Sequence, residues 1–79
     1  MNAPERIVER QRLLAEIKAT IDELEEAEKL IGELKPRSVY IGLAGGLMIE
    51  VDNETALEYV RRRKENLSIL YEKLKSEEG

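Results

Sequence analysis

Carboxylates gather most densely in one run of the chain, at Asp22, Glu23, Glu25, Glu26 and Glu28. Oxygen ligands of this kind could hold a divalent cation or form an acidic docking strip. On a helix these positions spread over more than one face, and no His or Asn follows three or four residues on to complete a metal site. We therefore expect a solvated helix face, in which Glu25 and Lys29 form an i,i+4 ion pair.

Four consecutive cations, Arg61-Arg62-Arg63-Lys64, could contact phosphate groups. On a helix they point in different directions, and no aromatic residue on an exposed strand accompanies them to stack a base. The formal net charge of −4 also argues against nucleic-acid binding. The run is expected to be a solvated face or to form ion pairs between subunits, with Glu58 and Arg62 as one i,i+4 pair. An RNA-binding helical hairpin is the distant alternative.

The remaining candidates for chemistry lack the groups that a reaction needs. Gly42, Gly45 and Gly46 do not lead into Lys-Ser/Thr and a helix, as a phosphate-binding loop would. The chain has no Cys and no His, so the commonest general base is missing. No candidate base is therefore present to activate the three serines, Ser38, Ser68 and Ser76. The sequence predicts no enzyme, no metal and no cofactor.

The first long segment, residues 4–34, has the apolar spacing of a helix. Asn2 is a plausible N-cap, and Glu5 three residues on completes a capping-box pattern. Pro36 prevents continuation because it pushes Lys35 out of α-helical backbone space. The apolar seam consists of Ile7, Leu14, Ile17, Ile21, Leu24, Ala27, Ile31 and Leu34.

A second helix is predicted over residues 53–76, with Asp52 or Asn53 as its N-cap. Its seam follows a heptad register that Arg63 interrupts, and this arginine is expected to extend out of the seam or to specify register. The seam positions are Ala56, Val60, Arg63, Leu67, Leu70 and Leu74. Both helices belong to one predicted domain, residues 1–79.

Residues 39–51 read as an apolar β-hairpin, because β-branched and aliphatic residues flank Gly45-Gly46. With the hairpin between two helices, the predicted fold is mainly α: an antiparallel two-helix coiled coil with the hairpin at its closed end. A two-stranded ribbon is marginal alone and has two unpaired edges. In a chain of 79 residues with little to cover it, the hairpin is expected to pair with other chains. The assembly residues would be Val39, Tyr40, Ile41, Leu43, Leu47, Met48, Ile49 and Val51.

Composition suggests where such a protein works. No apolar run approaches the roughly 20 residues of a membrane span, and the first residues lack the layout of a signal peptide. A cytoplasmic protein is therefore expected. Abundant Glu, Lys and Arg also suggest a heat-adapted, archaeal or thermophilic host.

The region from Leu34 to Glu77 resembles the prefoldin β-type subunits. The matching residues are Pro36, Val39, Tyr40, Gly45, Leu47, Met48, Ile49, Val51, Asp52, Ala56 and Leu57. The heptad tail, Arg63 to Leu67 and Glu72 to Leu74, is also similar. Residues 4–34 match that family only as a coiled-coil pattern.

The resemblance implies an ATP-independent chaperone (a holdase) that passes unfolded clients to a chaperonin. Its partners would be other prefoldin-like subunits, in a homo- or hetero-oligomer such as a hexamer, whose hairpins form an intersubunit β-barrel. Clients would bind at the coiled-coil tips, at Ile7, Val8, Leu13, Tyr71 and Leu74. The helices are shorter than that family's. The alternative is therefore a non-catalytic, prefoldin-like accessory subunit of another multiprotein complex.

Overall fold

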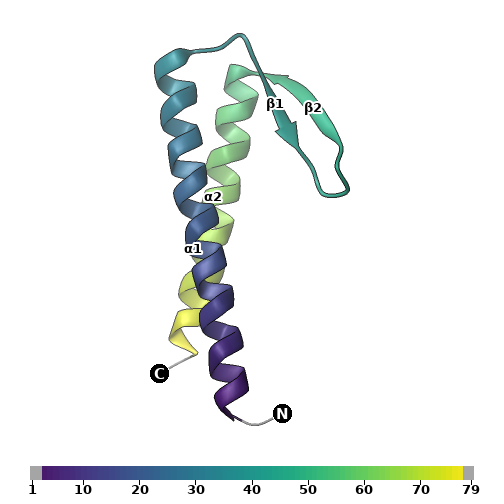
Figure 1. Cartoon of the computed structure of the whole chain (residues 1–79). Helices are drawn as coiled ribbons and strands as arrows, with labels where there is room; N and C mark the ends of the chain where they lie inside the picture. Colours follow the sequence, from purple (N-terminus) through teal and green to yellow (C-terminus); the bar gives the residue numbers. More distant parts are fainter. Residues whose placement is uncertain (1–2, 78–79) are drawn as a thin grey trace.

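The computed structural model describes residues 3–77, with side chains from Arg6 to Glu77. Helix α1 (Ala3–Leu34) is followed by strands β1 (Ser38–Gly42) and β2 (Met48–Asp52) and by helix α2 (Asn53–Ser76). The helices lie antiparallel and side by side, with the start of α1 and the end of α2 at one end of the molecule and the hairpin at the other (Figure 1). The molecule measures 50 × 25 × 15 Å. The predicted mainly helical fold with an antiparallel hairpin between two helices is confirmed.

Helix α1 ends as the sequence predicts. Lys35 has a φ of +48°, in the left-handed region, and its N–H donates to the carbonyl of Ile31 at 3.0 Å. This is the single-bond C-terminal motif that glycine most often occupies. Pro36 disfavours right-handed helical backbone at Lys35, so the chain leaves the helix here. The capping box predicted from Asn2 and Glu5 lies outside the described part of the chain.

Asp52 caps helix α2, which settles the choice between Asp52 and Asn53. Its carboxylate accepts a hydrogen bond of 2.7 Å from the N–H of Thr55, one of the helix donors without an intrahelical partner. Asn53 has another role, because its Nδ2 donates to the carbonyl of Ile31 at 3.4 Å. The start of α2 is thereby joined to the last turn of α1.

The core lies between the helices and under the base of the hairpin. At the closed end, Ile31, Ala56 and Val60 form a buried cluster against which both hairpin strands pack. Toward the open end of the helix pair, Ile17 and Ile21 of α1 are also buried. The α1 seam is thus as predicted from Leu14 to Ile31, whereas its predicted ends, Ile7 and Leu34, are exposed.

The α2 seam differs from the prediction at two positions. Arg63 is exposed, and Lys64 takes its place at the helix interface. Leu70 is likewise exposed, and Tyr71 is the half-buried residue beside it. The exposure of Arg63 agrees with the first of its two predicted roles, in which it extends out of the seam, but the seam position predicted for it is taken by Lys64. The four-residue step from Val60 to Lys64 carries the interface past Arg63.

The hairpin turn confirms the prediction for the glycine pair. Gly45 and Gly46 have φ values of +87° and +85°, which residues with a Cβ rarely adopt. Two hydrogen bonds close the loop, from Gly46 N to the Leu43 carbonyl at 3.2 Å and from Leu43 N to the Leu47 carbonyl at 2.6 Å. Within the described residues, no helix is long and apolar enough to cross a membrane.

Candidate functional site

The hairpin has one face toward the helices and one face away from them. Paired residues of an antiparallel ladder point to the same face, so Val39, Val51, Ile41 and Ile49 share one side. Val39 and Val51 pack against the core cluster. The base of this face is therefore committed to the chain's own helices.

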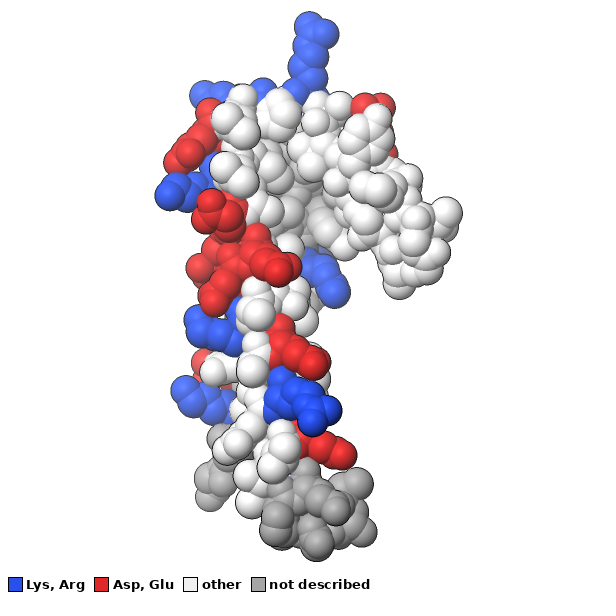
Figure 2. All heavy atoms as spheres, viewed as in Figure 1, with Lys and Arg blue, Asp and Glu red and all other residues white. Residues whose placement is uncertain are grey.

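Toward the turn, the hairpin leaves apolar side chains in solvent. Of the eight predicted assembly residues, Val39 and Val51 are half-buried and Ile41 is buried. The other five are exposed, by 37 to 67%, and they are Tyr40, Leu43, Leu47, Met48 and Ile49. Figure 2 shows the same region as an almost uncharged surface, in contrast to the charged helices. Contiguous apolar surface of this kind is typical of an interaction site.

The open end of the helix pair carries the other predicted site. Ile7, Val8 and Leu13 are exposed, whereas Tyr71 and Leu74 are half-buried. A shallow depression of about 280 Å³ is lined by Arg6, Glu9, Arg10, Leu13, Leu74 and Glu77. The structure thus brings Leu13 and Leu74 together in one depression, with charged side chains around them.

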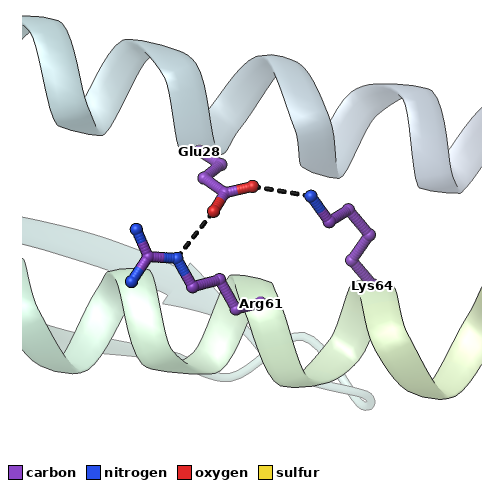
Figure 3. Close-up of polar contacts among 3 residues, drawn as sticks. All are labelled: Glu28, Arg61 and Lys64. Atoms are coloured by element: carbon purple, nitrogen blue, oxygen red, sulfur yellow. Dashed lines mark hydrogen bonds and ion pairs between the residues drawn. The ribbon is translucent and has the colours of Figure 1, made fainter.

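Glu28 forms the main polar contact between the helices. Its carboxylate accepts a hydrogen bond of 2.7 Å from Lys64 Nζ and one of 2.6 Å from Arg61 Nε (Figure 3). The Glu28 and Lys64 side chains are mostly shielded, at 23% and 29% exposed, whereas Arg61 is 63% exposed. The hydrogen bonds from Lys64 and then Arg61 lower the pKa of Glu28 below its ordinary value. We call these three residues the interhelix clamp.

The sequence pattern does not predict this clamp. It indicates a solvated acid at Glu28 and a solvated or intersubunit role for the basic run Arg61–Lys64. A signal was present, because Glu28 and Arg61 are at nearly equal distances from the two hairpin strands along the chain. Helices that run antiparallel from a shared hairpin bring such positions side by side.

The other charged residues behave as surface groups. Asp22, Glu23, Glu25 and Glu26 are exposed, and among the described residues no three acidic side chains converge on a metal site. The predicted pair of Glu58 and Arg62 is present at 3.0 Å. The predicted pair of Glu25 and Lys29 is not formed within the described part of the chain. Asp22 instead pairs with Lys18, at 3.2 Å.

Two of the three predicted serine candidates form local hydrogen bonds. Ser38 Oγ donates to the carboxylate of Glu50 at 2.9 Å, across the strands, and Ser76 Oγ donates to the backbone carbonyl of Lys73. Both hydroxyl groups thus act in local structure.

Comparison with protein-family models, with curated proteins and with solved structures finds no match to this chain.

Proposed function

We propose that the chain is a prefoldin-like chaperone subunit whose hairpin joins other subunits and whose helix tips hold unfolded proteins. The observation that carries this proposal is the hairpin, which exposes five large apolar residues beside two short strand edges. A ribbon of this kind is marginal in water without further strands. Prefoldin-like subunits would supply them, and the hairpins would then close into a shared β-barrel.

Client holding would take place at the open end. In the proposed assembly the two helices of each subunit form a coiled-coil tentacle that carries Ile7, Val8 and Leu13 on its surface. One such patch binds weakly, but several patches on one particle bind the same unfolded chain at once. The overall affinity then rises through effective concentration. No nucleotide and no catalytic step take part, and a cytoplasmic location belongs to the same proposal.

A second candidate is an accessory subunit that assembles through its hairpin but holds no clients. The surroundings of the tip favour it, because Arg6, Glu9, Arg10 and Glu77 line the depression together with two leucines. A charged rim of this kind suits a dedicated partner better than an arbitrary unfolded chain.

Aggregation of a thermally unfolded test protein separates the two candidates. The assembled particle should suppress the rise in light scattering. A triple variant, Ile7→Ser, Val8→Ser and Leu13→Ser, should lose most of this effect while the particle keeps its native mass. The control is Leu30→Ser, because Leu30 and Leu13 are equally exposed, at 44%. If the assembled wild type does not suppress aggregation, the accessory-subunit function replaces the chaperone function.

A further inference from the structure

The two strands of the hairpin are not equally available to a partner. On the face toward the helices, Ile41 of β1 is 8% exposed and its partner Ile49 of β2 is 44% exposed. In Figure 1, β1 lies between α2 and β2. β1 is therefore the strand nearer α2, with Ile41 buried, and β2 forms the outer edge of the sheet.

The hydrogen-bond pattern shows which backbone groups this outer edge presents. Leu43 N donates to the Leu47 carbonyl, so these two residues form a hydrogen-bonded pair. Hydrogen-bonded pairs alternate along an antiparallel ladder, which places Ile49 and Val51 among the residues bonded to β1. Met48 and Glu50 then point their N–H and C=O groups outward. Within the described part of the chain, no further backbone hydrogen bond reaches them.

Glu50 lies at the centre of this edge. Its side chain is exposed and accepts a hydrogen bond from Ser38, and it forms no ion pair with a described cation. If two copies paired β2 to β2 about the centre of the strand, their Glu50 side chains would lie directly opposite each other. Like charges at directly opposed positions destabilise a sheet. A charge on an edge strand is also a common device against self-pairing.

We infer that Glu50 selects the partner of the hairpin: the β2 edge takes an extended strand from a different chain, with Lys or Arg opposite Glu50. An antiparallel partner strand runs in the opposite direction to β2. The partner residue two positions C-terminal to this Lys or Arg therefore lies opposite Met48. Met48 is 65% exposed, so an apolar residue fits there. The inference rests on the proposed function, in which the hairpin is the assembly element, and adds which strand the outer edge accepts.

A charge-swap experiment with the whole chain tests this inference. Wild type and Glu50→Lys are each measured alone and as an equal mixture, by analytical ultracentrifugation at low and high salt. The mixture places Lys opposite Glu across the β2 edge. Its dissociation constant should be about tenfold below that of wild-type self-association, because one repulsive pair becomes attractive. High salt should reduce the difference.

The control is Glu23→Lys, an equal change of charge at an exposed position of α1, away from the hairpin. The mixture of this variant with wild type should behave as wild type alone. The inference is overturned if the Glu50→Lys mixture associates no better than wild type, or if the Glu23→Lys mixture gains as much. The inference is also overturned if wild type self-associates and the Glu50→Gln variant self-associates with the same affinity. That last result would leave hairpin assembly standing, so the inference and the proposed function can fail separately.

Discussion

Ile41 and Ile49 are direct partners across the hairpin and share one face, yet one is buried and the other is nearly half exposed. Symmetric packing against the helices would cover both side chains. Instead, the base of the hairpin packs on the core and Ile41 of β1 is buried, whereas Ile49 of β2 and the turn are exposed. The part of the hairpin that the chain leaves uncovered is therefore the part that a partner can cover.

The closed-end core should be sensitive to the loss of a few methyl groups. Ile31→Ala removes a buried side chain from the cluster with Ala56 and Val60, and should lower the free energy of unfolding by about 2–4 kcal/mol. A single core in a chain of this size supplies only about 3–5 kcal/mol, so much of the variant should unfold. Leu30→Ala, at the neighbouring exposed position, should lower the same free energy by less than about 1 kcal/mol. Urea denaturation followed by circular dichroism measures both. Equal losses would contradict the described core.

Substitution by glycine should have opposite effects on the free energy of unfolding at the end of α1 and in its middle. Lys35→Gly should raise the free energy of unfolding by up to about 1 kcal/mol, because the left-handed backbone at +48° strains any residue with a Cβ. Lys29→Gly, in the middle of the same helix, should lower it by about 0.8–1 kcal/mol. Thermal denaturation of both variants checks the pair. A loss of stability in Lys35→Gly would show that the helix does not end in this conformation.

Acid should weaken the folded state through two carboxyl groups. The pKa of Glu28 is lowered by the hydrogen bonds from Lys64 and Arg61, and that of Asp52 by the hydrogen bonds from the Thr55 hydroxyl and N–H. A carboxyl group whose pKa is lower in the folded state stabilises the fold fully at pH values above its unfolded-state pKa. This stabilisation is lost as the pH falls through the folded-state pKa. The melting temperature should therefore be level near neutral pH and fall from about pH 4.5 downward.

Substitutions at the clamp test the same interaction. Glu28→Gln should lower the melting temperature at neutral pH and flatten the decline in acid, leaving the contribution of Asp52. Lys64→Gln should lower the neutral-pH melting temperature as well. Arg63→Gln is the matched control and should leave it nearly unchanged, because Arg63 is exposed and Lys64 faces Glu28. A larger effect at Arg63 than at Lys64 would favour the seam that the heptad pattern predicts.

The order of elements and the places where they end follow from local sequence. Gly45-Gly46 between two apolar runs specifies the hairpin, Pro36 ends the first helix and Asp52 starts the second. Each signal acts on backbone groups a few residues away, so one sequence is enough to read it.

The contacts between the helices could not be read in the same way. A heptad pattern ranks Leu70 above Tyr71 and treats Arg63 and Lys64 alike, because it has no knowledge of the facing helix. Lys64 enters the interface because its long apolar stem can lie in the seam while its ammonium group reaches Glu28. That choice depends on the register of two helices that are distant in sequence. Which apolar side chains of the hairpin stay exposed depends on the same packing.

The native mass of the particle, measured by light scattering, tests most directly whether the hairpin is the assembly element. The chain, as wild type and as Ile49→Asp, is mixed with a prefoldin subunit of the other type, the α type, which would be the proposed partner of a β-type subunit. Wild type should form a hexamer-sized particle. Ile49→Asp should remain dissociated with its helices intact by circular dichroism, because the shared sheet would bury an unpaired charge. Ile69→Asp, at an exposed apolar position on α2, should assemble as wild type does. A wild type that stays monomeric in the mixture, or an Ile49→Asp variant that keeps the full mass, would contradict the account.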